Sequence, residues 1–100
     1  MNSLLLQHLP EVKNLMRRFG VTSAFAFGSV VNDTKQTIND IDFIISFPES
    51  MDFEMYANNY FALANALEKL LQKKVDLVTE KTLKNPYLLQ DINSHKVQLI

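Results

Sequence analysis

The spacing of apolar residues changes along this 100-residue chain, and each spacing predicts a different element. Between Pro10 and Phe19 apolar side chains recur at helical intervals, which predicts a helix that packs on a sheet and ends with Gly20 as its cap. Proline suits the start of a helix because its missing N–H has no partner there. The residues before Pro10 are compatible with a separate turn of helix. The predicted core-facing residues are Leu9, Val12, Leu15, Met16 and Phe19.

Three apolar segments rich in β-branched and aromatic residues predict strands. The first runs from Val21 to Phe27, and the second runs from Ile41 to Phe47, where Pro48 closes it. The third runs from Lys74 to Thr79. A last short strand or a docked tail is expected at Lys96 to Ile100.

From Phe53 to Lys73 the spacing is again helical, and Ser50 or Asp52 would cap the first turn. The main apolar stripe is expected to cover one face of the sheet and consists of Phe53, Tyr56, Tyr60, Leu63, Ala64, Leu67 and Leu71. The opposite side carries a weaker apolar set of Met55, Ala62 and Ala66, with Phe61 on the flank. This set indicates contact with a partner or with a second copy of the chain, although isolated exposed apolar residues are common.

The order of elements and the length of the chain together predict one small domain. Residues 82 to 94 are expected to form one or two short helical pieces broken around Pro86. The chain therefore combines expected helices with expected strands, and an α/β (α+β) fold is predicted. Because 100 residues suffice for one core, residues 1 to 100 are expected to form a single domain.

Composition and charge narrow the class of protein. With 47% apolar and 21% charged residues, the chain is typical of a globular protein. Its net charge of −1, with basic pairs only at Arg17–Arg18 and Lys73–Lys74, argues against direct nucleic-acid binding. The absence of cysteine excludes disulfides and thiolate metal sites and suits a reducing cytoplasm. No signal peptide or membrane span is expected, because the leucines at 4 to 6 belong to no long apolar run.

The candidate chemistry lies where the first predicted strand ends and the second begins. Gly28 and Ser29 form a turn, and after ten intervening residues the chain reads Asp40-Ile41-Asp42. Alternate residues of a strand share a face, so Asp40 and Asp42 point to one spot while Ile41 takes the opposite face. Two carboxylates about 4 Å apart repel by about 4 kcal/mol at an effective dielectric constant of about 20. Such a pair favours a cation or a proton between its members, and a hard divalent ion such as Mg²⁺ fits oxygen ligands.

Three further residues suit the same site. A glycine lets a ligand approach the backbone, and a serine at a helical turn offers its hydroxyl beside free N–H groups. Gly28 and Ser29 are therefore candidate phosphate ligands, and Asp76 on the third strand is a candidate third carboxylate. Each feature also has a plain structural interpretation, because Asn39 and Asp40 suit a turn that opens a strand and Asp76 could be an isolated acid.

This order of motifs resembles the DNA polymerase beta-like nucleotidyltransferase superfamily, and most closely its small members, the minimal nucleotidyltransferases. In that family a Gly-Ser turn precedes Asp-x-Asp, and a third Asp lies on a later strand. The resemblance covers nearly the whole chain and implies a small mixed β-sheet flanked by helices, the palm fold of these enzymes. It also implies that Asp40, Asp42 and Asp76 bind metal and act in catalysis, and that Gly28 and Ser29 bind the nucleotide. The implied cofactor is Mg²⁺, and the implied substrate is ATP or another nucleoside triphosphate.

The resemblance further implies a protein partner. Minimal nucleotidyltransferases are similar to antitoxins that transfer AMP to a tyrosine of an all-helical HEPN protein, so the chain is expected to be the antitoxin of such a pair. Two departures from the family pattern leave alternatives open, since Val30 and Asp33 stand where active relatives commonly have Arg and Gly. One alternative is a catalytically weak or inactive domain that neutralises its partner by direct contact. The other is a nucleotide sensor.

Overall fold

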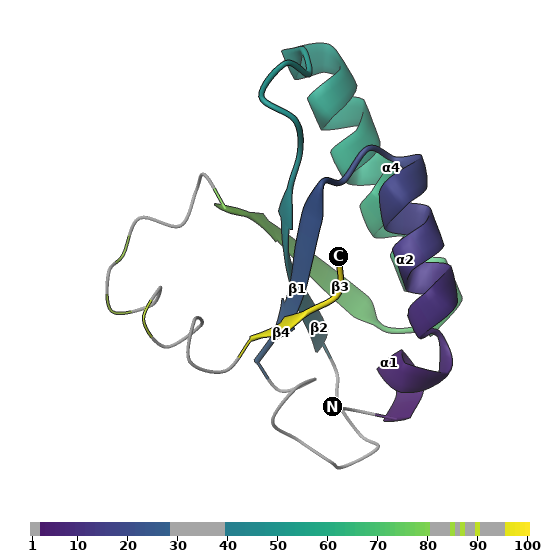
Figure 1. Ribbon diagram of the computed structural model, residues 1–100. Coiled ribbons are helices and arrows are strands. Elements are labelled where there is room, and N and C mark those ends of the chain that lie inside the picture. The colour runs from purple at the N-terminus through teal and green to yellow at the C-terminus, as the bar shows by residue number, and fades with distance from the viewer. Residues whose placement is uncertain (1–2, 29–39, 81–84, 86, 88–89, 91–95) are drawn as a thin grey trace.

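In the described part of the chain two helices precede two strands, and a longer helix then precedes the last two strands (Figure 1). The computed structural model describes residues 3–28, 40–80, 85, 87, 90 and 96–100. The helices are α1 (Ser3–Gln7), α2 (Leu9–Arg18) and α4 (Phe53–Leu71), and the strands are β1 (Ser23–Phe27), β2 (Asp40–Ser46), β3 (Lys74–Thr79) and β4 (Val97–Gln98). This order confirms the predicted α/β class.

The strands form one mixed sheet in the order β3-β2-β1-β4. β1 runs antiparallel to both β2 and β4, whereas β2 and β3 run parallel. Parallel neighbours need a crossover connection, and α4 supplies it between β2 and β3. β3 is therefore an edge strand, with β2 as its neighbour in the described sheet.

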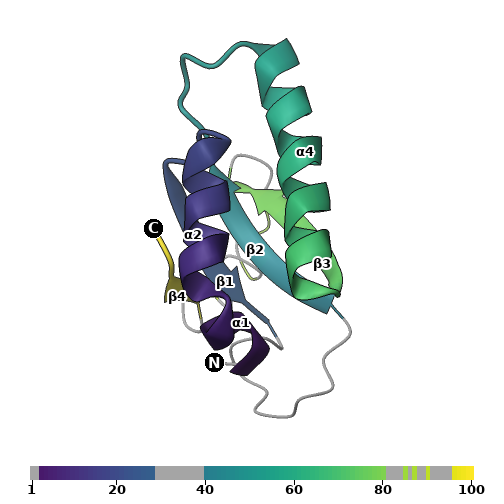
Figure 2. The same cartoon turned by 90° about the vertical axis from the view of Figure 1, so that its right-hand side faces the viewer.

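Both long helices cover the same face of the sheet. Figure 2 shows α2 and α4 side by side in front of the strands. The core between these layers consists of fully buried apolar side chains, and burial of each contributes roughly 1.5–3 kcal/mol. The helices contribute Val12, Met16, Leu63, Leu67 and Leu71, and the strands contribute Ala24, Ala26, Ile41, Phe43 and Ile45. The amphipathic spacing of the two helices thus determines which face of the sheet stays open.

The ends of the elements agree closely with the sequence patterns. The turn of helix expected before Pro10 is α1, and Gly20 follows the end of α2 with a φ of +88°, the left-handed conformation that often ends a helix. Asp52 caps α4, since its Oδ1 accepts a hydrogen bond of 2.8 Å from the Met55 N–H. At its other end α4 stops at Leu71, because Gln72 adopts a left-handed conformation with a φ of 55°. The predicted continuation of this helix to position 73 is therefore wrong.

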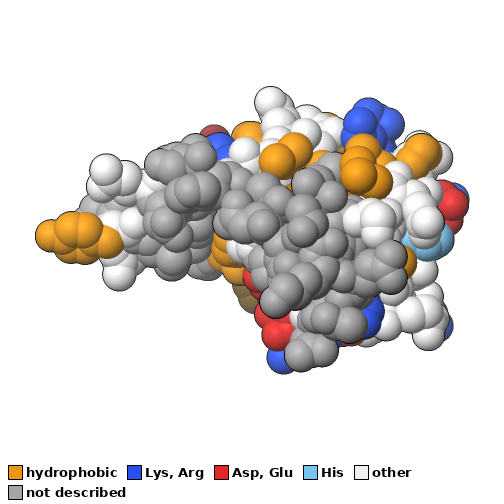
Figure 3. Space-filling model, turned by 90° about the horizontal axis from the view of Figure 1, so that it is seen from below, with side chains coloured by type: hydrophobic (Ala, Val, Ile, Leu, Met, Phe, Trp, Pro, Cys, Tyr) orange, Lys and Arg blue, Asp and Glu red, His pale blue; other side chains and the backbone are white. Residues whose placement is uncertain are grey.

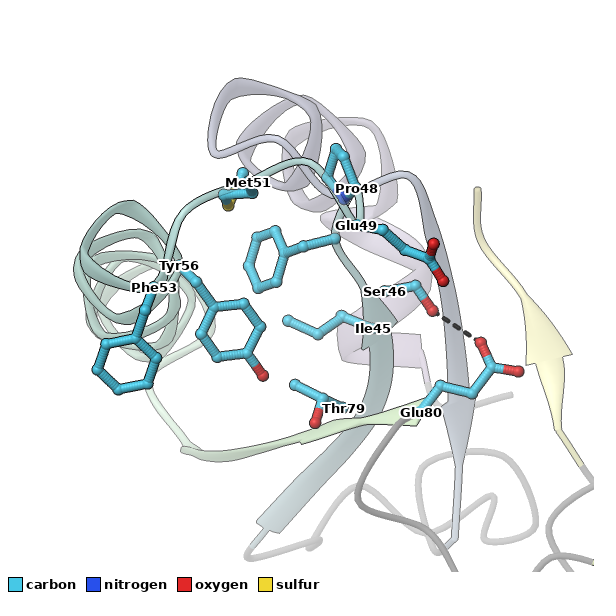
Figure 4. Close-up of a pocket in the computed structure, with 10 residues that line it drawn as sticks. Ile45, Ser46, Pro48, Glu49, Met51, Phe53, Tyr56, Thr79 and Glu80 are labelled. Carbon is cyan, nitrogen blue, oxygen red and sulfur yellow. Dashed lines mark hydrogen bonds between the residues drawn. The ribbon is translucent and has the colours of Figure 1, made fainter.

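Phe53 does not join the buried stripe of α4, so that prediction is also wrong. Its side chain is 83% exposed, whereas Tyr56, Tyr60 and Ala64 pack against the core as expected. Phe53 is the first residue of the helix, and Figure 4 shows its ring pointing outward from the helix. Helical periodicity alone does not indicate how far the covered sheet extends beneath the first turn.

Some expectations concern residues that the structure does not describe. Most of residues 82 to 94 lies outside the described part, although Tyr87 and Gln90 within it are helical. The last expected strand is present as the short β4. None of the described helices is long and apolar enough to cross a membrane.

Candidate active site

Gly28 lies where β1 ends and faces a carboxylate of the neighbouring strand. Its φ of +75° is a conformation that other residues rarely adopt. A Cβ atom at this position would stand 2.8 Å from Asp42 Oδ2, closer than side chains approach one another. The backbone of Gly28 therefore lies in close contact with the Asp42 carboxylate. Ser29, the second residue of the predicted phosphate-binding turn, lies outside the described residues, as do Val30 and Asp33.

Asp42 sits in the middle of three strands. It pairs with Phe27 on β1 and with Asp76 on β3, so these positions form one row across the sheet. Along β2 the side chains of Ile41 and Phe43 are fully buried, whereas Asp42 is half-buried on the other face. The row therefore places Asp42 and Asp76 on the face that α2 and α4 leave open.

The two carboxyl groups of this row interact directly. Burial raises the pKa of Asp42, and the negative charges of Asp76 and then Asp40 raise it further. A hydrogen bond between the side chains of Asp42 and Asp76 acts in the same direction. A half-buried carboxyl group surrounded by like charge is stabilised by a proton or by a cation. Within this row, no positively charged side chain compensates the negative charge of Asp42.

Asp40 lies outside this close pair. It is exposed at the start of β2 and pairs in register with Lys74 at the start of β3. Figure 3 looks onto the lower end of the molecule, where acidic and basic side chains gather beside one another. Within the described part of the chain, no three acidic or histidine side chains meet closely enough to form a preformed metal cluster. The structure therefore brings Asp42 and Asp76 together and places Asp40 nearby as a third charge.

Two side chains of α4 contact β3 on either side of Asp76, and the sequence patterns did not identify them. Tyr60 Oη donates a hydrogen bond to the Leu77 carbonyl oxygen, and Glu68 Oε2 accepts one of 3.1 Å from the Val75 N–H. Burial raises the pKa of Tyr60, and Tyr56 and Asp76 add to the rise. The Tyr60 hydroxyl therefore keeps its proton and remains a donor. The sequence predicted Tyr60 only as a core or interface aromatic, because periodicity carries no information about hydrogen bonds.

One cavity lined by described residues lies away from these carboxylates. It has a volume of about 490 Å³ and lies where β2 and β3 end, lined mainly by Ile45, Phe47, Met51, Tyr56 and Thr79 (Figure 4). The row of Asp42 and Asp76 lies near the opposite ends of the same strands, roughly 10 Å away at about 3.3 Å per residue. The carboxylates therefore lie apart from this cavity, which neither Asp42 nor Asp76 lines.

Comparison with known proteins agrees with this arrangement. The sequence model of the nucleotidyltransferase domain family matches residues 9–99. A Methanocaldococcus jannaschii protein named "Putative protein adenylyltransferase MJ1379" is 32% identical over 95 residues, which cover 87% of this chain and 93% of that protein. The residues matched by the family model, 9–99, include every strand of the described sheet.

Solved structures share the fold. One described as a "putative minimal nucleotidyltransferase" matches with a TM-score of 0.73 and 28% identity, covering 97% of this chain and 95% of that one. A Shewanella oneidensis complex of a tri-AMPylated HEPN toxin with its MNT antitoxin matches with a TM-score of 0.66 and 22% identity, covering 95% and 71%. The chain therefore belongs to the nucleotidyltransferase domain family, as a minimal nucleotidyltransferase of the DNA polymerase beta-like superfamily.

Proposed function

We propose that this nucleotidyltransferase transfers AMP from ATP to a hydroxyl of a partner protein, with Mg²⁺ as its cofactor. The observation that carries the proposal is the close pairing of Asp42 with Asp76 beside the backbone of Gly28. Support for adenylyl transfer comes from the M. jannaschii relative, which is named for that activity on protein. Binding of a metal ion and a nucleotide would account for an acidic pair whose members raise each other's energy within the described part of the sheet.

The side chains present fit a magnesium ion. All the candidate ligands are carboxylate oxygens, which Mg²⁺ prefers, and the raised pKa of Asp42 indicates a charge that a cation would stabilise. Mg²⁺ commonly takes only one or two carboxylates and completes its shell with water and phosphate oxygens, so it needs no closed cage of protein ligands. We assign Asp42 and Asp76 as the principal ligands, with exposed Asp40 as a further one. Held by these carboxylates, Mg²⁺ would supply positive charge that stabilises the phosphates during transfer.

The protein's own groups have separate roles in the proposed reaction. The backbone at Gly28 gives the phosphates close approach, and Ser29 is proposed to hold the distal phosphates. Asp76 is proposed either to accept the proton of the acceptor hydroxyl or to hold a second ion. The acceptor oxygen forms a bond to the α-phosphorus while the bond from that phosphorus to the β-phosphate oxygen breaks. AMP is thereby attached to the acceptor, and pyrophosphate leaves.

We further propose that the acceptor belongs to a HEPN-type protein and that this chain is its antitoxin. The Shewanella oneidensis complex supports this, because there an MNT antitoxin with the same fold is bound to a HEPN toxin that carries AMP. The mode of neutralisation would be covalent, by modification of a hydroxyl that the partner needs.

The test is transfer of label from [α-³²P]ATP to the partner in the presence of Mg²⁺. The wild type is expected to label the partner, and Asp40→Ala combined with Asp42→Ala is expected to lose at least 100-fold in rate. Glu49→Gln, which removes an acid in the turn that follows β2, serves as the matched control and should keep its activity. Equal labelling by wild type and double variant, or labelling by neither, would contradict the proposal.

A second candidate function is neutralisation of the partner by contact alone. Phe53, Met55 and Phe61 on α4 are 83%, 51% and 65% exposed, an unusual concentration of apolar surface on one helix. The departures at Val30 and Asp33 favour the same alternative. It predicts that the variant lacking Asp40 and Asp42 still protects cells from the partner as fully as the wild type does.

A further inference from the structure

The face to which the Asp76 side chain points depends on how an edge strand, β3, pairs with its neighbour. Asp40 and Asp42 share β2, which has neighbours on both sides, whereas β3 pairs with β2 alone within the described sheet. A slip of β3 by one residue would turn Asp76 to the opposite face, because successive side chains of a strand alternate. Edge strands also expose unpaired backbone groups that invite other pairings. Burial of Val75 and Leu77 on the core face already favours the orientation in which Asp76 faces Asp42, and contacts along the outer edge of β3 can reinforce it.

Two side chains of α4 occupy the outer edge of β3. Glu68 accepts a hydrogen bond from the N–H of Val75, and Tyr60 donates one to the carbonyl of Leu77. Backbone groups of alternate residues in a strand point to the same side, so residues 75 and 77 present theirs along one edge. The two hydrogen bonds therefore lie on either side of Asp76, where a further strand would otherwise pair.

Ring packing on α4 holds the Tyr60 side chain in position. The chain turns back after Gln72, so the last turns of α4 lie over the start of β3. The Tyr60 ring stacks on Tyr56 with ring centroids 6.4 Å apart and meets Phe61 edge-on at 5.3 Å. Its hydroxyl is therefore aimed by packing, and its contact with β3 needs little further ordering of the side chain.

We propose that Tyr60 and Glu68 are positioning residues for nucleotidyl transfer, which hold the register of β3 so that Asp76 faces Asp42. The inference rests on the proposed role of Asp76 in metal binding. It assigns to α4 a function beyond covering the core. Loss of both hydrogen bonds would leave the fold in place and loosen the carboxylate row.

A purely structural role makes a different prediction. If the two hydrogen bonds only cover the strand edge, their removal would lower the unfolding temperature and leave metal binding of the folded protein unchanged. If they position Asp76, metal affinity falls as well, and residues that orient metal ligands commonly contribute 10- to 100-fold to that affinity. The deciding measurement is therefore the affinity for metal below the unfolding temperature.

The experiment measures Mn²⁺ binding by electron paramagnetic resonance, in the presence of an ATP analogue with a methylene group between its α and β phosphorus atoms. Tyr60→Phe combined with Glu68→Met removes both hydrogen bonds at nearly constant volume and is expected to raise the Kd for Mn²⁺ about tenfold. Glu68→Gln keeps an oxygen acceptor and should stay close to wild type. Tyr56→Phe removes the hydroxyl of the adjacent stacked ring and should also stay close to wild type.

Asp76→Asn separates this inference from the proposed function. If Asp76→Asn weakens Mn²⁺ binding and the double variant binds within twofold of wild type, the positioning role is wrong and the proposed function stands. If Asp76→Asn binds as wild type does, the proposed role of Asp76 fails, and the positioning role fails with it. Should the double variant not fold, Tyr60→Phe and Glu68→Met are measured singly, each with an expected three- to fivefold rise in Kd. Single variants within 1.5-fold of wild type would overturn the inference.

Discussion

Gly28 approaches Asp42 so closely that a Cβ atom at position 28 would stand 2.8 Å from the Asp42 Oδ2 oxygen. The contact places backbone of β1 beside the carboxylate that pairs with Asp76. Residue 28 therefore has two separate reasons to be glycine, its positive φ and the carboxylate in front of it.

Gly28→Ala is expected to lower the free energy of unfolding by about 1–2 kcal/mol and the rate of AMP transfer at least tenfold. The stability loss comes from the positive φ, and the rate loss comes from displacement of Asp42. Chemical denaturation and transfer of labelled AMP measure the two effects.

Gly20→Ala is the matched control for this substitution. Gly20 also has a positive φ, but its added Cβ would meet the flexible end of Met51 at 3.0 Å and no acid. It should lose about 1 kcal/mol of stability and keep its rate within twofold. Equal rates in the two alanine variants would show that the contact with Asp42 is irrelevant to the reaction.

Asp42→Asn is expected to stabilise the metal-free protein while it abolishes transfer. Asparagine removes the charge that burial, Asp76 and Asp40 disfavour, and its amide can still donate a hydrogen bond to Asp76. Because the site is partly open to solvent, the gain should be at most about 1 kcal/mol. Thermal unfolding without divalent ions checks this, and a variant less stable than wild type would contradict it.

The difference in free energy of unfolding between wild type and Asp42→Asn should depend on pH. The pKa of Asp42 is raised above its ordinary value of 3.8, so the folded state keeps this proton after the unfolded state has lost it. The contribution of Asp42 to stability therefore falls as pH rises from about 3.8 through its folded pKa and stays low above that. We expect wild type and Asp42→Asn to be close at pH 3.5 to 4 and to diverge toward neutral pH. A stability difference that does not change with pH would show that the raised pKa of Asp42 is not its cause.

Asp52→Ala is expected to destabilise the protein without affecting its chemistry. The Asp52 side chain caps α4 through its hydrogen bond with the Met55 N–H, and loss of such a cap costs about 1 kcal/mol. For a domain of this size that corresponds to a fall in Tm of roughly 5 °C. Asp52→Ser can still cap the helix and should recover most of the loss. AMP transfer at 25 °C should match wild type in both variants.

Local patterns were enough to predict most elements of the fold. β3 spans the predicted residues from Lys74 to Thr79, and Asp52, one of the two cap candidates, caps α4 because its side chain accepts a hydrogen bond from a free N–H of the first turn. The alternation that puts Asp40 and Asp42 opposite Ile41 is likewise a property of a single strand. Each of these features depends on residues close together in the sequence.

The remaining features depend on pairings between distant residues. Strand order and register place Asp76 beside Asp42, and no periodicity within either strand states which positions will pair. The approach of Gly28 to Asp42 and the hydrogen bond from Tyr60 to Leu77 depend on the same pairing. The exposure of Phe53 depends on where the sheet ends beneath α4. These relationships arise from tertiary packing, so they became visible only in the structure.

The parallel crossover between β2 and β3 also determines when the acidic pair can exist. A nascent chain that has formed only the β1–β2 hairpin carries Asp40 and Asp42 but lacks the third carboxylate. β3 follows the 19 residues of α4, so its pairing with β2 is a non-local contact of the kind that forms slowly. A molecule in which β3 has not yet docked lacks the paired carboxylates on which the proposed transfer of AMP depends.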